Sequence, residues 1–113
     1  MVHLVTAIVK PHTIDDVKDA LRGLGINGLT MTEVRGYGRQ GGKTETFRGS
    51  EYQLDFVPKV KLEVVVATEL VDKTIATIAD AARTDKIGDG KIWAVSLDRL
   101  LRIRTGEFGE EAL

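Results

Sequence analysis

The residues best suited to chemistry in this 113-residue chain are glycines and cations gathered in short segments. One of them, Lys86–Lys91, has the sequence KIGDGK. Its two glycines allow backbone N–H groups to converge on an anion, and Lys91 adds a positive charge. The segment is not a Walker A loop, because its glycines are too close together and Ile92 replaces the Ser or Thr. Taken alone, the segment favours a tight turn that merely exposes Lys91, and an anion site is the alternative.

Two arginines near the C-terminus form a second cationic group. The segment 100–105, LLRIRT, predicts a short strand, so Arg102 and Arg104 are expected to project to one side. With Lys91 they would clamp a polyphosphate, because the planar donors of arginine suit phosphate oxygens. The alternative is a solvated charged surface balanced by the carboxylates of Glu107, Glu110 and Glu111.

A glycine-rich arm, Gly36–Tyr52, separates two predicted strands and shows no hydrophobic period. Its start, GYGRQG, matches the dinucleotide pattern G-x-G-x-x-G, but that fingerprint must open a helix, and the residues that follow lack helical periodicity. The alternative is a flexible hairpin tip. Long segments without structure of their own are uncommon in compact domains and are usually functional or disordered, which favours a functional arm.

Composition and motifs argue against several other classes of protein. The net charge of −1 gives no basic field for nucleic acid, and the absence of cysteine excludes disulfides and thiolate metal sites. No apolar run approaches the ~20 residues that span a bilayer. The N-terminal segment lacks signal-peptide features, so a cytoplasmic location is expected. No catalytic triad or carboxylate pair indicates an enzyme.

Hydrophobic periodicity predicts two similar strand–helix–strand halves. This pattern indicates a single α+β domain over 1–113, a ferredoxin-like βαββαβ sandwich with both helices on one sheet face. Thr13 is expected to cap the first helix and Gly25 to end it. The predicted strands are 3–10, 29–38, 59–67 and 92–97, with 100–105 as a short fifth, and the helices are 13–25 and 69–84. Their apolar faces carry Ile14, Val17, Leu21 and Leu24, and Val71, Ile75, Ile78 and Ala82.

The sheet face away from the helices is predicted to be polar in part. Alternation places Thr30 and Thr32 on one face of the second strand, and Lys59, Lys61 and Glu63 on one face of the third. Such a face either meets water or lines the inside of a symmetric oligomer, and the spacing does not choose between these.

Taken in this order, the segments resemble the PII family of nitrogen signal-transduction proteins over nearly the whole chain. The matching segments are TAIVKP, TEVRGYGRQ, RGSEY, DFVPKVKLEVVV, KIGDGKIW and RIRTGE. The resemblance implies a homotrimer of ferredoxin-like subunits that bind ATP or ADP in the clefts between them. It identifies the arm, about 38–55, as a T-loop, about 84–91 as a B-loop, and about 102–113 as a C-loop.

The resemblance also implies roles for individual residues. Around the nucleotide phosphates it places Gly88, Asp89, Gly90 and Lys91, with Arg102 and Arg104 from the adjacent subunit. Around the adenine it places Thr30, Glu63 and Val65, with Ile8 nearby. At the T-loop base it places Gly36, Gly38 and Arg39. For 2-oxoglutarate it implies Arg39, Gln40 and Lys59, with Gln40 also helping to bind Mg²⁺. Tyr52 and Ser50 match positions that some members modify.

The chain departs from the usual family pattern in three places. Gly41–Lys43 replace the common Lys-Gly-His, which would affect target choice. Asp85 replaces a glycine, so its carboxylate either lies near the phosphates and weakens nucleotide binding or points outward. Phe47 stands where many members have tyrosine, which removes a hydroxyl.

The function implied by the resemblance is non-catalytic regulation. Such a protein binds ATP or ADP, senses 2-oxoglutarate together with Mg-ATP, and acts through its T-loop on an ammonium channel, nitrogen-assimilation enzymes or their regulators. One alternative is a trimeric ferredoxin-like protein for ion tolerance or small-ligand binding that does not sense nucleotide. Another is a small phosphate-processing enzyme, which steady ATP turnover would reveal.

Overall fold

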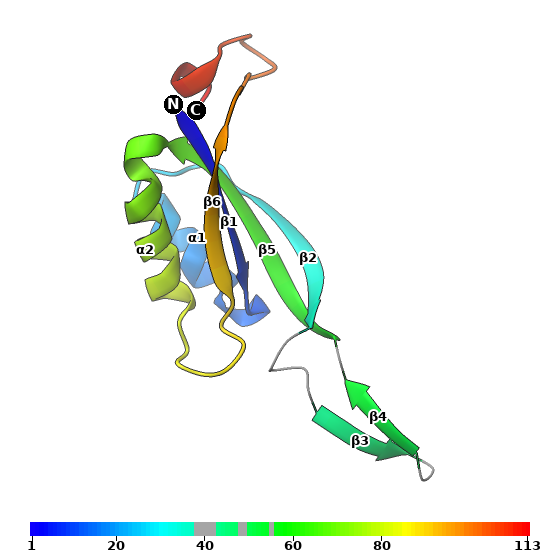
Figure 1. Cartoon of the computed structure of the whole chain (residues 1–113). Helices are drawn as coiled ribbons and strands as arrows, with labels where there is room; N and C mark the ends of the chain where they lie inside the picture. Colours follow the sequence, from blue (N-terminus) through cyan, green and yellow to red (C-terminus); the bar gives the residue numbers. More distant parts are fainter. Residues whose placement is uncertain (38–42, 48–49, 55) are drawn as a thin grey trace.

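The chain folds into a four-stranded antiparallel sheet with two helices on one of its faces (Figure 1). The computed structural model describes residues 1–37, 43–47, 50–54 and 56–113, the two middle segments by their backbone alone. The strand order is β2-β5-β1-β6. The strands are β1 (Val2–Val9), β2 (Thr30–Tyr37), β5 (Phe56–Ala67) and β6 (Lys91–Leu97). This arrangement confirms the predicted ferredoxin-like βαββαβ sandwich.

Helix α1 (Ile14–Gly23) follows a short 3-10 turn, Pro11–Thr13. Thr13 occupies the N-cap position, but the predicted side-chain cap is wrong, because its hydroxyl donates backward to the carbonyl oxygen of Lys10 at 2.8 Å. Gly25 ends the helix as predicted: it adopts a φ of +91°, and the N–H of Ile26 then donates to the carbonyl of Leu21.

Helix α2 (Val71–Ala82) follows a second 3-10 turn, Thr68–Leu70. It packs beside α1 on the same sheet face. Of the predicted helix faces, the side chains buried in the core are Val17, Leu21, Ile78 and Ala82. Ile14, Val71 and Ile75 are partly buried and pack against them. Within the described residues, neither helix is long and apolar enough to cross a membrane.

The sheet contributes alternate side chains to this core. The residues of the two central strands that belong to the core cluster are Val5, Ala7, Val9, Val60, Leu62, Val64 and Val66. The intervening residues point to the face that the helices leave open. Lys59, Lys61 and Glu63 therefore share one face, as predicted.

Strand register fixes which residues are neighbours on the open face. One row across the four strands contains Thr32, Lys61, Ile8 and Lys91, and the next contains Thr30, Glu63, Thr6 and Trp93. Trp93 and Val95 remain 44% and 48% exposed on this face. The open face thus combines polar side chains with exposed large apolar ones.

The arm has more regular structure than the sequence predicts. Backbone pairing joins β3 (Lys43–Phe47) and β4 (Ser50–Leu54) into a separate two-stranded antiparallel sheet. The prediction of a segment without structure of its own is therefore wrong for these residues. The missed signal is the alternation in KTETF, where β-branched threonine recurs every second residue.

The predicted short strand at 100–105 is also wrong. Only Leu101 pairs, through a single bridge to Phe108, and the chain turns between them. The turn is closed because Gly106 N–H donates to the Arg102 carbonyl at 2.8 Å and Arg102 N–H donates to the Glu107 carbonyl at 2.9 Å. The alternation of charged and apolar residues in RIR is typical of a strand. Gly106, with a φ of +73°, favours the turn instead. The chain then ends in a 3-10 turn, Gly109–Ala112.

Candidate anion-binding site

The turn that joins α2 to β6 has the conformation needed to surround an anion. Gly88 and Gly90 adopt φ values of +93° and +103°, which side-chain-bearing residues rarely adopt. Asp85 is the one non-glycine with positive φ, at +62°, among the described residues. Alternation of left-handed and ordinary backbone directs successive N–H groups toward a common concavity.

Close contact with β1 makes a glycine necessary at position 90. A Cβ there would lie 1.7 Å from the carbonyl oxygen of Ile8, well inside contact distance. Because the clashing atom belongs to the backbone of a central strand, it cannot move aside cheaply. The turn is therefore pressed against the end of β1.

The carboxylate of Asp89 lies on the inner side of the turn. It accepts hydrogen bonds from the Thr84 N–H at 2.8 Å, the Thr84 hydroxyl and the Asp85 N–H at 3.0 Å, and it pairs with the Lys10 ammonium at 3.1 Å. The Thr84 hydrogen bonds, helped by those of Lys10 and Asp85, hold the pKa of this carboxyl well below its usual range. Asp89 therefore stays charged and shapes the turn.

Lys59 holds the turn from the neighbouring strand β5. Its ammonium donates to the carbonyl oxygen of Gly88, and the residue is only 7% exposed. Burial lowers its pKa, the nearby Lys10 lowers it further, and Asp89 opposes both effects. Two buried ammonium groups thus lie near a single carboxylate, so the region beneath the turn favours an additional anion.

Residues predicted for different parts of the ligands line one cavity of about 600 Å³. They are the phosphate-side Gly88, Asp89, Gly90 and Lys91, Gly36 of the T-loop base, Lys59 of the 2-oxoglutarate set, and Ile8, predicted near the adenine. Tyr37, Val57, Ile87 and Trp93 give the same cavity an apolar side. A glycine turn, two lysines and apolar surface together suit a ligand with both an anionic and an apolar part.

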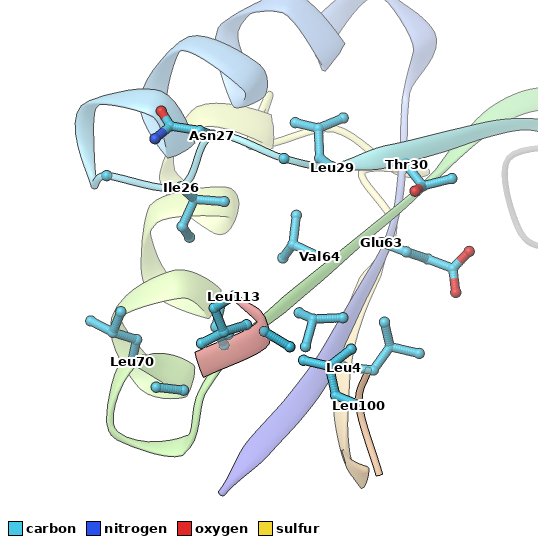
Figure 2. A pocket seen from close by; sticks show the side chains of 16 residues that line it. Leu4, Ile26, Asn27, Leu29, Thr30, Glu63, Val64, Leu70, Leu100 and Leu113 are labelled. Carbon is cyan, nitrogen blue, oxygen red and sulfur yellow. The ribbon is translucent and has the colours of Figure 1, made fainter. Parts of the chain in front are cut away.

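The predicted adenine-side residues line a different cavity, of about 900 Å³. Thr30, Glu63 and Val65 belong to it, and Figure 2 shows Thr30 and Glu63 at one side of a group of apolar side chains. That group includes Leu4, Ile26, Leu29, Leu70, Leu100 and Leu113. Ile8 lines the cavity at the glycine turn and not this one, so one chain does not gather all the predicted nucleotide residues in one place.

Comparison with known proteins decides the family. The family model described as nitrogen regulatory protein P-II matches residues 2–107. The chain belongs to the P-II family. A nitrogen regulatory protein P-II of Rhizobium etli is 56% identical over 110 residues, 97% of this chain and 98% of that protein. Nitrogen regulatory protein GlnK of Escherichia coli K12 is 53% identical over 110 residues, again 97% of this chain and 98% of the relative.

A solved P-II structure also matches the fold. The crystal structure of Arabidopsis thaliana PII bound to citrate superposes with a TM-score of 0.82 at 41% identity. The match covers 99% of this chain and 92% of the plant chain. The family assignment therefore rests on sequence and on structure.

The two arginines of this P-II chain do not join Lys91 within the subunit. Neither lines the cavity that contains Lys91, and the predicted extended segment that would align them is a turn. Arg102 instead donates to the carboxylate of Glu107 at 3.0 Å and to the carbonyl oxygen of Glu111 at 2.6 Å. Arg104 is exposed.

Several predicted positions of the P-II arm lie beyond the structural description. Gly38, Arg39 and Gln40 are outside the described residues. Ser50 and Tyr52 lie in β4, where register places Ser50 opposite Phe47 and Tyr52 opposite Glu45 along the backbone. The roles of these residues in ligand binding or modification stay predictions.

Two residues that were not predicted as site residues hold the glycine turn of this P-II chain. Lys10 and Thr84 both bind Asp89, and the Lys10 ammonium also donates to the Thr84 hydroxyl at 3.0 Å. They are separated by 74 positions, so no local motif links them. The one available signal is Pro11, which fixes the backbone just after Lys10.

Proposed function

We propose that this P-II protein is a non-catalytic sensor of cellular energy and nitrogen status. It binds ATP or ADP in competition, binds 2-oxoglutarate together with Mg-ATP, and regulates partner proteins through the 38–55 arm. The observation that carries the proposal is the Gly88–Lys91 turn, held against β1 and opening on a cavity that also contains Lys59.

The chemistry of this turn suits polyphosphate. Backbone N–H groups of a glycine turn and fixed ammonium groups are the usual partners of phosphate oxygens. Lys91 lines the cavity and is exposed, so its charge is available to a ligand. The apolar side of the cavity would receive an uncharged part of the nucleotide.

The separation of the predicted residues into two cavities favours a site shared between subunits. In the proposed homotrimer, one subunit contributes the phosphate-side cavity. Its neighbour contributes the adenine-side residues Thr30, Glu63 and Val65 and the cations Arg102 and Arg104. Exposed Trp93 and Val95 on the open sheet face support burial against other subunits, since exposing large apolar side chains to water costs free energy.

We further propose that 2-oxoglutarate binds beside the phosphates. Lys59 would pair with one of its carboxylates, and Arg39 and Gln40 would complete the site from the arm, with Gln40 also donating its oxygen to Mg²⁺. The citrate bound to the Arabidopsis thaliana protein supports a site for a small polycarboxylate in this family. Ligand binding at the arm base would change the arm's shape and thereby its affinity for partners.

The proposed partners follow from the family. GlnK and the other relatives are named for nitrogen regulation, which favours an ammonium channel, nitrogen-assimilation enzymes or their regulators as targets in the cytoplasm. Tyr52 and Ser50 are the proposed sites of modification on the arm.

Calorimetry with ATP, ADP and 2-oxoglutarate, alone and in combination, tests this function. We expect both nucleotides to bind and 2-oxoglutarate to bind only with ATP and Mg²⁺ present. Lys59 already donates to the Gly88 carbonyl, so without Mg-ATP it offers little to a dicarboxylate on its own.

Gln40→Ala should retain ATP binding and lose most 2-oxoglutarate binding. Equal 2-oxoglutarate binding by wild type and variant, with and without Mg²⁺, would contradict the metal bridge. Absence of ATP binding would favour a trimeric ferredoxin-like protein that takes another small ligand. Steady ATP turnover above background would favour a phosphate-processing enzyme.

A further inference from the structure

Lys10 is a buried cation that the proposed ligand contacts do not use. It follows β1 directly and is only 8% exposed. Its backbone is fixed on the C-terminal side, because Pro11 restricts the chain and Thr13 donates to the Lys10 carbonyl through both its N–H, at 3.1 Å, and its hydroxyl, at 2.8 Å. The side chain therefore starts from a rigid base.

The ammonium group of Lys10 is directed at the B-loop. It lies 3.1 Å from a carboxylate oxygen of Asp89 and donates to the Thr84 hydroxyl at 3.0 Å. Asp89 in turn accepts from the N–H groups of Thr84 and Asp85, where the turn begins. Lys10 is thus connected through one carboxylate to both ends of the Thr84–Asp89 segment.

We propose that Lys10 is a positioning residue for polyphosphate binding, acting on the ligand through Asp89. This inference rests on the proposed function, because it assigns a role at the same site. It also changes the expected role of Asp89, which becomes the inner brace of the B-loop while backbone N–H groups and Lys91 meet the phosphates.

The three consecutive residues at the top of the turn each have a separate anchor. The Gly88 carbonyl accepts from Lys59, the Asp89 carboxylate pairs with Lys10, and Gly90 lies against the Ile8 carbonyl. All three anchors come from adjacent strands β1 and β5 or the residue that follows β1. A turn fixed this way keeps its N–H groups oriented before the ligand arrives, which reduces the entropy lost on binding.

Removing Lys10 should therefore loosen the turn. The Lys10–Asp89 ion pair is partly buried, so loss of the Lys10 charge weakens the hold on the Asp89 carboxylate. Asp89 would then move toward water and release the Thr84 and Asp85 N–H groups. The phosphate-binding N–H groups beyond them would lose their fixed orientation.

A double-mutant cycle separates positioning from direct attraction of the ligand. We expect Lys10→Met to weaken ATP binding about tenfold, and Asp89→Asn to weaken it similarly. In the Asp89→Asn background, Lys10→Met should have little further effect on ATP binding. Lys10 acts through its ion pair with the Asp89 carboxylate, and that carboxylate is already absent. Lys10→Arg, which keeps the charge, should recover part of the affinity. Lys18→Met, on an exposed face of α1, is the matched control and should bind as wild type.

Two results of the cycle would overturn the proposal. One is an unchanged ATP affinity in folded Lys10→Met. The other is a full, additive loss from Lys10→Met in the Asp89→Asn background, which would show that Lys10 attracts the phosphates directly.

Hydrogen exchange of the ligand-free protein supplies a second readout. The amides of Thr84 and Asp85, which donate to Asp89, should exchange faster in Lys10→Met, whereas the amides of β1 should keep their wild-type rates. Unchanged exchange at both amides would overturn the proposal. Wild-type protein that fails to bind ATP would contradict the proposed function alone, and the exchange rates would still decide whether Lys10 holds the turn.

Discussion

At the scale of single residues, Asp85 occupies a backbone conformation that glycine adopts more easily. Its φ is +62°, and its N–H donates to Asp89. The family resemblance leads us to expect glycine at this position, so Asp85 would keep the turn while adding strain and a negative charge. Aspartate tolerates this conformation better than most residues.

Asp85→Gly should stabilise the protein by about 1 kcal/mol and strengthen ATP binding, because it relieves the positive φ and removes an exposed carboxylate near the turn. Asp85→Asn is the matched control, since it keeps a similar side chain without the charge. Thermal unfolding and calorimetry measure the two effects. A lower melting temperature for Asp85→Gly would show that the aspartate conformation is not strained.

Asp89 makes stability depend on pH in a predictable direction. Its folded-state pKa is held low, chiefly by hydrogen bonds from Thr84, so folding favours the ionised form. The resulting stabilisation is present above the unfolded pKa of about 3.9 and is lost as the pH falls toward the folded value.

Asp89→Asn should therefore be less stable than wild type at neutral pH, and the difference should shrink as the pH falls below about 4. Denaturant unfolding at neutral and acidic pH measures this, with the exposed Asp98→Asn as a control for general loss of a carboxylate. A difference between Asp89→Asn and wild type that stays constant with pH would contradict the bracing role of Asp89.

At the scale of elements, the core strands and helices could be predicted because their apolar residues follow simple periods. Val60, Leu62, Val64 and Val66 alternate along β5, and Val17 and Leu21 recur at helical spacing in α1. The 100–105 segment could not be predicted this way, because alternation in RIR indicates a strand while hydrogen bonds closing at Gly106 determine a turn.

The turn at Gly88–Lys91 could be predicted because its signal is local. The segment carries its own glycines, and Gly88 and Gly90 adopt positive φ in the structure. Its binding of an anion stays a prediction. The bracing by Lys10 could not be found, because it joins residues 74 positions apart whose types are unremarkable alone. The division of the proposed ligand residues between two cavities could not be predicted from the sequence either, because strand register determines which residues share a surface.

The C-terminal turn leads to a prediction about the cations. Arg102 is engaged with Glu107 and the Glu111 carbonyl, whereas Arg104 is exposed on the turn and would be available to a neighbouring subunit in the proposed trimer. Hydrogen bonds to charged groups contribute roughly 1.5–3 kcal/mol each, so Arg104→Ala should weaken ATP binding by about tenfold or more without changing the assembly. Arg99→Ala, also exposed, is the control. An unchanged ATP affinity in folded Arg104→Ala would show that Arg104 does not contribute to nucleotide binding.

At the scale of the whole molecule, the residues proposed to bind nucleotide line two separate cavities of one chain. The glycine turn with Lys91 lies at one cavity, and Thr30, Glu63 and Val65 lie at another. Exposed Trp93 and Val95 lie on the sheet face that the helices leave open. A closed trimer would bury this face and bring unlike halves together, so light scattering should report three times the chain mass of 12.4 kDa.

The most direct test of the shared site mixes two defective chains. Lys91→Ala damages the glycine-turn half and Arg104→Ala damages the other half, so each variant alone should bind ATP only weakly. Assemblies that contain both chains, purified through two different tags, include clefts in which intact Lys91 of one subunit meets intact Arg104 of its neighbour. Calorimetry should then detect a class of sites with wild-type affinity that neither variant shows alone. Uniformly weak ATP binding by the mixed assemblies, or tight ATP binding by a monomeric wild type, would contradict the account.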